Sequence, residues 1–318
     1  MKLALIGYGN VGRALARLLR ARRAEFPFTI TGIHTLRHGT AVDSKGITDA
    51  EKFGPRAASI EEFLDAAGAD IAVELTTLSP ADGEPAISHI RAAIARGMHV
   101  VTANKGPIAY AYADLRQAAA ATGVHFRFES AVMDGAPVFN LWRHTMPGVR
   151  VLGFTGALNS TSKVIIESME RGESFDEGLA AARAMGITEA DGAFDVEGWD
   201  SAAKAAALAN VLMDARVTPL QVSTRGITRL TPQRLGEINS QGKTVRLISR
   251  GRRTPAGISL RVRAEVLNRN DLLACTPGTS NLLLFHTDLM GTFGTVSIDP
   301  GVDQTAYGVF SDLVSCGV

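Results

Sequence analysis

The chain opens with the stretch KLALIGYGNVG, residues 2–12, in which a short apolar run leads into glycines at positions 7, 9 and 12. This G-x-G-x-x-G spacing lies between a predicted strand and an amphipathic helical pattern, the setting in which it indicates a dinucleotide-binding loop. The first glycine permits a tight turn, the second lets the backbone approach a pyrophosphate, and the third allows helix and strand to pack closely. The alternative is a glycine-rich turn without a ligand. We predict a nicotinamide dinucleotide bound by Gly7, Gly9, Asn10, Val11 and Gly12.

Apolar runs in the first 130 residues predict a parallel sheet, because they are short, regularly spaced and separated by helical patterns. The predicted strands cover residues 2–6, 28–34, 70–75, 99–102 and 124–128. Ser59 and Glu62 have the spacing of a capping box at the start of one crossover helix, and Pro107 suits the first turn of another. The fold class is therefore α/β, with a doubly wound, Rossmann-type nucleotide-binding domain.

The pattern changes after about residue 128, where strand-like segments alternate with longer helical ones. The predicted strands cover residues 150–158, 244–250, 258–266, 281–286 and 293–298. The predicted helices cover residues 161–170, a segment that begins near Ser174 with a capping-box Glu177, residues 199–212, and residues 304–313. A second, α+β domain for substrate binding and dimerisation fits this mixture. We expect a dinucleotide-binding domain over 1–133, the second domain over 134–300, and a C-terminal helix within 301–318 that returns to the nucleotide domain.

The composition argues against several classes of protein. The 318 residues include 33 Lys+Arg and 32 Asp+Glu, so the basic excess typical of nucleic-acid-binding proteins is missing. The apolar stretches fall short of the roughly 20 residues that span a bilayer. Cys275 and Cys316 are too few for a disulfide framework or a zinc ribbon. We expect a cytoplasmic protein that binds a small-molecule substrate, with neither nucleic acid nor membrane as a partner.

The end of the second predicted strand bears on the choice of nicotinamide. An acidic residue at this point would receive the ribose hydroxyls of NAD, but residues 34–38 are His-Thr-Leu-Arg-His. The sequence therefore favours NADP, with NAD as the alternative. The Arg37 guanidinium suits a 2′-phosphate, although a solvated surface arginine is the competing interpretation.

Three further segments carry a family resemblance. Thr102-Ala-Asn-Lys105 follows the fourth predicted strand, and Gly156-Ala-Leu-Asn-Ser-Thr161 ends a strand of the second domain. Residues 189–204, EADGAFDVEGWDSAAK, match the pattern E-x-D-P-x-x-D-x-x-G-x-D-x-A-x-K almost throughout. With these segments the chain resembles a homoserine dehydrogenase of the short form, which lacks aspartokinase and regulatory domains.

The resemblance implies an NADP-dependent oxidoreductase that interconverts homoserine and aspartate 4-semialdehyde, a step toward threonine and methionine. It implies that Lys105, Lys204 and Asp200 form the catalytic group and that Glu189 and Asp195 bind the substrate.

The chemistry of these residues is consistent with that assignment. Asp200 and Lys204 lie four residues apart on one predicted helical face, which as a structural ion pair is worth only ~0.2–0.5 kcal/mol. Carbonyl reduction needs a proton for the developing alkoxide, and a lysine supplies one when burial or a second cation brings its pKa toward neutrality. Residues expected near the nicotinamide are Thr76, Thr77, Lys105 and Gly301.

The chain departs from the family pattern at several substrate-side positions. Thr161 and Lys163 are also expected to bind the substrate, but Lys163 stands where a small polar residue is usual and adds a further lysine to the expected site. Gly192 replaces the proline of the pattern, and Ile187 replaces a common aromatic. The alternatives are therefore an NADP-dependent dehydrogenase of another small hydroxy compound, with a carboxylate or phosphate facing Lys163, and a catalytically silent dinucleotide-binding regulator.

Two further expectations come from the resemblance. The segment after the last nucleotide-domain strand is similar to one that holds a monovalent cation through backbone carbonyls, here those of Glu129, Val132 and Asp134; an interdomain turn without metal is the alternative. The second domain is expected to form a homodimer.

Overall fold

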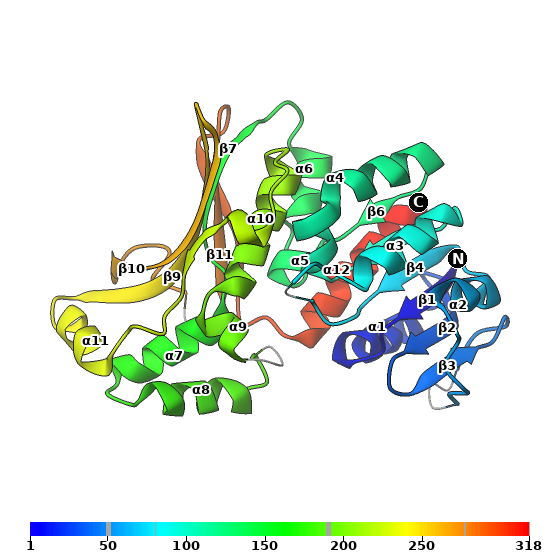
Figure 1. Ribbon diagram of the computed structural model, residues 1–318, viewed down its shortest axis with the longest axis horizontal. Coiled ribbons are helices and arrows are strands. Elements are labelled where there is room, and N and C mark those ends of the chain that lie inside the picture. The colour runs from blue at the N-terminus through cyan, green and yellow to red at the C-terminus, as the bar shows by residue number, and fades with distance from the viewer. Residues whose placement is uncertain (49–51, 80, 189–191, 277, 318) are drawn as a thin grey trace. The chain divides into compact units, whose positions relative to one another are not determined.

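The computed structural model describes residues 1–48, 52–79, 81–188, 192–276 and 278–317 (Figure 1). The chain divides into two compact units. The first comprises Met1–Phe139 together with Gly301–Val318, and the second comprises Asn140–Pro300. Each unit has its own six-stranded sheet.

The sheet of the first unit has the strand order β3-β2-β1-β4-β5-β6. Its strands are β1 (Lys2–Ile6), β2 (Thr29–Thr35), β3 (Gly39–Val42), β4 (Ile71–Glu74), β5 (His99–Thr102) and β6 (Phe126–Arg127). All but β3 pair in parallel, which confirms the predicted doubly wound fold. Because the strand order reverses between β1 and β4, the carboxyl ends of these strands border the crevice where such sheets bind ligands.

Strand β3 was not predicted and pairs antiparallel with β2 at the edge of the sheet. It has four residues, too few to show a hydrophobic period, and one of them is Gly39. Gly39 has a φ of +90°, which favours glycine because the conformation is left-handed. The hairpin it allows places residues 36–38 at a turn directly after β2.

The helices of the first unit are α1 (Asn10–Ala21), α2 (Ile60–Ala67), α3 (Ala86–Ala95), α4 (Lys105–Thr122), α5 (Ser130–Met133) and α12 (Val302–Gly317). Ser59 caps α2 as predicted, by accepting the Glu62 N–H at 3.1 Å. The Glu62 carboxylate instead accepts the Ala58 N–H at 2.7 Å, so the predicted reciprocal half of the capping box is wrong.

Helix α12, the last element of the chain, lies in the core of the first unit. It packs against α1, and Val309 and Leu313 are fully buried there. Phe310 packs edge-on to Phe26, with ring centroids 5.2 Å apart. Burying side chains of this size contributes roughly 1.5–3 kcal/mol each, so α12 stabilises the fold of the first unit.

The sheet of the second unit has the order β12-β11-β7-β9-β10-β8. Its strands are β7 (Val151–Ala157), β8 (Ser223–Arg225), β9 (Lys243–Thr254), β10 (Gly257–Asn268), β11 (Asn281–Thr287) and β12 (Thr292–Ser297). All neighbours are antiparallel except β8, which is parallel to β10. The three-residue β8 was not predicted; the other five were.

Helices cover one side of this second sheet. They are α6 (Phe139–Thr145, whose first residue closes the first unit), α7 (Ser160–Glu170), α8 (Phe175–Ala184), α9 (Gly192–Val196), α10 (Trp199–Leu212) and α11 (Pro232–Asn239), with a 3₁₀ turn at Pro219–Gln221. In Figure 1 α7 and α10 lie on the same side of the strands, and α10 packs against β9 and β10. The predicted capping box is confirmed, because Ser174 and Glu177 exchange both hydrogen bonds.

In the part of the chain that the structure describes, no helix is long and apolar enough to cross a membrane.

Candidate active site

The glycine loop between β1 and α1 leaves room for an anion. Gly7 has a φ of +97°, and a Cβ there would lie 2.7 Å from the Leu75 carbonyl oxygen, so the turn requires glycine. A Cβ on Gly12 would lie 3.1 Å from the Gly7 carbonyl oxygen, whereas Gly9 has open space around it. Among the described residues, no side chain caps the start of α1 and none in its first turn is acidic. The positive end of the helix is therefore available to a pyrophosphate, with Asn10 and Val11 in its first turn.

The β2–β3 hairpin carries the residue predicted to select the nicotinamide. Thr35 fixes the turn, because its hydroxyl donates to the Gly39 carbonyl at 3.2 Å. Burial lowers the pKa of His34, so its ring is neutral at pH 7 and lies 2.9 Å from the Thr40 hydroxyl through Nδ1. Arg37 is exposed, and within the described ranges its guanidinium has no hydrogen bond or ion pair. The side chain is free to meet a ligand or to remain solvated.

A buried carboxylate joins the carboxyl ends of β4 and β5. Glu74 accepts the Thr76 N–H at 2.9 Å and the Thr102 hydroxyl at 2.9 Å, and the Thr76 hydroxyl also donates to it. The Thr102 hydroxyl oxygen accepts the Asn104 N–H at 2.9 Å, and the Asn104 amide donates to the Thr76 carbonyl at 3.2 Å. The four residues form a closed network that fixes both loops leaving the strands.

The structure places Lys105, Thr76 and Thr77 at the same edge of the first sheet as the glycine loop. Lys105 is the half-buried first residue of α4, directly after the helix cap Asn104, whose Oδ1 accepts the Gly106 N–H at 2.9 Å. The Thr76 hydroxyl is used by Glu74, while Thr77 is exposed. Thr77 therefore offers its hydroxyl more directly to a ligand than Thr76 does.

The Glu129 carboxylate, in the segment predicted to hold a cation, is used as a backbone clamp. Its Oε1 accepts the Val138 N–H at 2.5 Å and the Phe139 N–H at 3.0 Å. The Glu129 N–H donates to Asp312 Oδ2 at 2.6 Å, which joins the segment to α12. Over the described ranges, no group of three or more His, Cys, Asp or Glu side chains is arranged to hold a metal ion.

The other residues of that prediction lie in the same segment, beside the start of α12. Val132 is buried within α5, and Asp134 adopts a φ of +57° and accepts the Thr305 hydroxyl at 3.2 Å. Gly301 precedes α12, and its carbonyl accepts the Thr305 N–H at 3.2 Å. A Cβ on Gly301 would meet open space, so no contact with the described residues requires glycine at this position.

In the second unit, one asparagine brings together three of the residues predicted from the family pattern. The Asn159 amide nitrogen donates to Asp195 Oδ1 at 2.8 Å and to Asp200 Oδ2 at 3.0 Å. Lys204 Nζ lies 3.1 Å from Asp200 Oδ2 and donates to the Leu158 carbonyl at 2.7 Å. Asp195 and Asp200 are 2% and 3% exposed, so the polar cluster is buried within the second unit.

Local structure explains how these side chains meet. The β7 strand ends at Ala157, and Asn159 caps α7 by accepting the Ser162 N–H at 2.7 Å. Short helix α9 carries Asp195, and α10 carries Asp200 and Lys204 four residues apart, on one helical face.

Lys163 and Thr161, both on α7, make contacts inside the second unit. The Lys163 amine donates to the Ser280 carbonyl and lies 3.4 Å from Thr276 Oγ1. Burial, and then the Arg246 charge, lower the pKa of Lys163 to about 8. The Thr161 hydroxyl donates to the Ile187 carbonyl at 3.0 Å. The predicted substrate contact of Lys163 gains no support from this geometry, because its buried amine already supports the segment around Ser280.

Glu189, the remaining predicted substrate residue, lies outside the described residues. Asn159 was not among the predicted site residues, although the sequence does carry a signal for it. An asparagine directly before an apolar helical pattern is a strong helix cap, and Asn159 stands between a predicted strand and a predicted helix. What the pattern could not show is that the other end of the amide faces two carboxylates.

Family models match both parts of the chain. One described as "Homoserine dehydrogenase" matches residues 137–314, more than half of the sequence. The chain belongs to the homoserine dehydrogenase family. A second model, "Homoserine dehydrogenase, NAD binding domain", matches residues 7–129. The protein is therefore an NAD(P)-dependent oxidoreductase of the homoserine dehydrogenase type.

Individual homoserine dehydrogenases are similar over nearly the full length of the chain. The NAD(+)-dependent homoserine dehydrogenase of Pseudomonas canavaninivorans is 36% identical, over 98% of this chain and 95% of that protein. The homoserine dehydrogenase of Methanocaldococcus jannaschii is 33% identical, over 99% of this chain and 98% of that protein. The crystal structure of the Thermoplasma acidophilum homoserine dehydrogenase superposes with a TM-score of 0.87 at 26% identity, over 99% of this chain and 98% of that one.

The first unit of this chain has the features that a nicotinamide dinucleotide requires. A Cβ is sterically excluded at Gly7, and the space beside Gly9 is open, as a backbone that approaches a pyrophosphate requires. The uncapped start of α1 lies at the same loop. The described residues that would hold the nucleotide are thus the glycine loop, with Thr77 and Lys105 at the same sheet edge.

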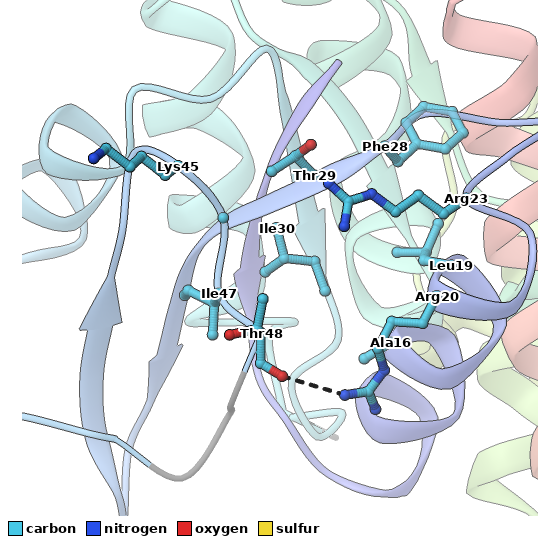
Figure 2. Close-up of a pocket in the computed structure, with 11 residues that line it drawn as sticks. Ala16, Leu19, Arg20, Arg23, Phe28, Thr29, Ile30, Lys45, Ile47 and Thr48 are labelled. Carbon is cyan, nitrogen blue, oxygen red and sulfur yellow. Dashed lines mark hydrogen bonds between the residues drawn. The ribbon is translucent and has the colours of Figure 1, made fainter.

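A pocket of about 120 Å³ in the first unit lies elsewhere (Figure 2). It is lined by the end of α1, the start of β2 and residues 45–48, and Arg20 reaches across it to the Thr48 carbonyl at 3.5 Å. Because it adjoins the amino end of β2 and contains no predicted site residue, it is not the nucleotide site of a homoserine dehydrogenase.

Proposed function

We propose that the protein interconverts homoserine and aspartate 4-semialdehyde with a nicotinamide dinucleotide. The observation that carries this proposal is the buried cluster of Asn159, Asp195, Asp200 and Lys204 in a chain of the homoserine dehydrogenase family. Homoserine brings an ammonium group, which buried carboxylates bind, and a hydroxyl whose proton must leave as the carbonyl forms. The cluster offers a group for each of these needs.

The residues divide the chemistry between them. Lys204, oriented by Asp200 Oδ2 at 3.1 Å and the Leu158 carbonyl at 2.7 Å, gives a proton to the substrate oxygen during reduction and removes it during oxidation. Asp195, with Glu189, binds the substrate ammonium group. Lys105, at the sheet edge that binds the nucleotide, is the second catalytic lysine. Nicotinamide, when bound, supplies the hydride for reduction.

A turnover panel tests this function. Purified protein is assayed with homoserine and with aspartate 4-semialdehyde, each with NADP and NAD in the matching redox state. We expect turnover of homoserine at a rate within the usual enzyme range. A folded protein that turns over neither compound with either nucleotide would refute the proposal.

We further propose that NADP is preferred over NAD. Residues 34–42 of the β2–β3 hairpin contain no acidic residue to receive a ribose hydroxyl pair, and Arg37 lies exposed at its turn. A bidentate guanidinium suits a 2′-phosphate. The Pseudomonas canavaninivorans relative is named as NAD(+)-dependent, so the choice must be measured in this chain. Arg37→Ala should raise the KM for NADP and leave that for NAD unchanged, with Arg23→Ala as the exposed control; equal losses for both nucleotides would contradict the role of Arg37.

A bound monovalent cation remains a prediction for residues 129–134. The Glu129 side chain is used by the Val138 and Phe139 N–H groups, so only backbone carbonyls are proposed as ligands there. Sodium or potassium titration of the apoprotein, followed by thermal stability, tests it. We expect one of the two ions to raise the midpoint at constant ionic strength, and identical midpoints would remove the site.

We also propose a homodimer formed by the second unit. Its edge strand β12 and the preceding hairpin expose large apolar side chains, including Leu289 at 70%, Met290 at 52% and Val296 at 49%. An exposed edge of this kind is a template for pairing with another strand. Light scattering at micromolar concentration should give twice the mass of the 33.6 kDa chain. A monomer would reject the proposal, and Val296→Lys should weaken the dimer.

A further inference from the structure

The carboxamide of Asn159 lies at the centre of the second-unit cluster, where it accepts one hydrogen bond and donates two. We infer that Asn159 is a positioning residue, which holds Asp195 and Asp200 in one fixed arrangement so that Asp200 can orient Lys204. The kinetic effect that we expect rests on the proposed function. The effect of the Asn159 amide on the two carboxylates does not depend on it.

The orientation of the amide follows from the helix it caps. Asn159 Oδ1 accepts the Ser162 N–H at 2.7 Å, which satisfies one of the unpaired donors at the start of α7. The nitrogen must then face the other way, toward Asp195 at 2.8 Å and Asp200 at 3.0 Å. A flipped amide would turn an oxygen toward two carboxylates and leave the Ser162 N–H facing an NH₂ group. The cap therefore fixes which atom the carboxylates meet.

Asp195 and Asp200 share the Asn159 amide nitrogen as a hydrogen-bond donor, which favours the ionised form of both carboxylates. Asp195 and Asp200 come from different helices, α9 and α10, and both are almost fully buried. Like charges this close favour protonation of one member, whereas an N–H donor stabilises both in the ionised form. Lys204 of α10 lies 3.1 Å from Asp200 Oδ2, whereas the α7 lysine, Lys163, donates to the Ser280 carbonyl.

A single main-chain turn connects the two ends of the cluster. Lys204 donates to the Leu158 carbonyl at 2.7 Å, and the next residue along the chain is Asn159. Leu158 thus holds Lys204 through its backbone carbonyl. The next residue, Asn159, holds Asp200, the partner of Lys204, through its side chain. Loss of the amide donor should leave the Lys204–Leu158 contact in place and remove the hydrogen bond that ties Asp200 to the turn after β7.

Two substitutions separate the amide donor from the helix cap. Asn159→Ser keeps a good cap for α7 but replaces the NH₂ group, which donates to both carboxylates, by a hydroxyl on a shorter side chain, which can donate to at most one. Asn159→Asp keeps both the shape and the cap but places an oxygen opposite the carboxylates. Thr231→Ala is the control for lost stability away from the cluster, because Thr231 caps α11 in the same unit by accepting the Arg234 N–H at 3.2 Å.

The kinetic expectation distinguishes positioning from folding. Asn159→Ser should lower kcat/KM for homoserine by about tenfold or more, since small misplacements of catalytic groups cost up to about a hundredfold. The KM for the nucleotide should stay within a factor of about two, and Asn159→Asp should lose more. Thr231→Ala should lower thermal stability, because it removes a helix cap, while keeping the parent kcat/KM. Parent-like kcat/KM in both Asn159 variants would overturn the inference.

A readout without turnover keeps the inference separate from the proposed function. Protein labelled with ¹³C at the Asp carboxyl carbons is titrated by NMR, with Asp195→Asn and Asp200→Asn used to assign the two resonances. In Asn159→Ser one of the two carboxyls should titrate at a higher pH than in the parent, and in Thr231→Ala neither should move. If the parent turns over no homoserine, the proposed function fails while this titration still decides the inference. Unchanged titration of both carboxyls in Asn159→Ser and Asn159→Asp would overturn it.

Discussion

The Thr102 hydroxyl donates to the Glu74 carboxylate at 2.9 Å, and these two residues are also direct neighbours in the parallel register of β4 and β5. Each strand leads into a loop with a predicted nucleotide residue, Thr76 or Thr77 after β4 and Lys105 after β5. One buried carboxylate therefore sets the starting point of both loops.

Glu74→Ala should lower the free energy of unfolding by roughly 2–4 kcal/mol. The substitution leaves the Thr76 N–H and two threonine hydroxyls without their acceptor in a buried place, and each unsatisfied group costs about 1–3 kcal/mol before relaxation. Urea denaturation gives the change, and nucleotide titration should show weaker binding. Glu25→Ala is the control, because Glu25 forms an exposed pair with Arg22, a type worth about 0–1 kcal/mol. Equal effects of the two substitutions would contradict the role of Glu74.

Gly7→Ala and Gly9→Ala should fail in different ways. Gly7→Ala forces a side chain into a φ of +97° and against the Leu75 carbonyl, so it should destabilise the first unit. Gly9→Ala adds a methyl group to open space and should leave the urea midpoint within experimental error. Because this space lies where a pyrophosphate would approach, Gly9→Ala should nevertheless raise the nucleotide Kd. Unchanged nucleotide affinity in a folded Gly9→Ala protein would remove the pyrophosphate from this loop.

Lys204→Ala should lower kcat by ~10²–10⁴ while the nucleotide still binds, since proton transfer contributes in the transition state. Lys204→Arg should not restore activity, because a guanidinium stays protonated at any working pH. Asp200→Asn should fall less steeply, because an amide can still accept a hydrogen bond from the lysine. Stopped-flow single turnovers with nucleotide Kd measured in parallel check these outcomes. A Lys204→Arg variant with most of the parent activity would reduce Lys204 to an electrostatic role.

Lys163 should make stability depend on pH in the alkaline range. Its pKa is about 8 in the folded protein against 10.5 for an ordinary lysine, so between these values the unfolded chain holds a proton that the folded chain has released. The free energy of unfolding should therefore rise with pH through this window, by up to about 3 kcal/mol. Urea denaturation at pH 7, 8, 9 and 10 should show the parent gaining stability relative to Lys163→Met. Lys45→Met, at an exposed position, should give a curve parallel to the parent; a parallel Lys163→Met curve would show that Lys163 does not titrate as stated.

The sequence predicts elements well where the pattern is long. Helix α10 begins and ends at the predicted residues, 199 and 212, because an alanine-rich helical run of that length leaves little choice. The capping box of Ser174 and Glu177 is local and was also predicted. Strands β3 and β8, with four and three residues, owe their existence to pairing with neighbours, which no local pattern displays.

The candidate site shows the same limit at the level of side chains. The spacing of Asp200 and Lys204 within one helix predicts their contact, and the structure has it at 3.1 Å. The direction of Lys163 depends on Ser280, more than one hundred residues away, so a position on α7 alone could not decide it. The double contact of Asn159 likewise depends on where α9 and α10 return to the turn after β7.

The place of α12 at the end of the chain has a consequence for synthesis on the ribosome. The second unit is one continuous stretch, residues 140–300, and is synthesised before residues 302–317. Until then Leu15 and Leu19 of α1 lack the helix that covers them in the finished protein. The nucleotide-binding unit therefore cannot complete its fold until α12 has followed the second unit, and before then it exposes an apolar surface of the kind that chaperones bind.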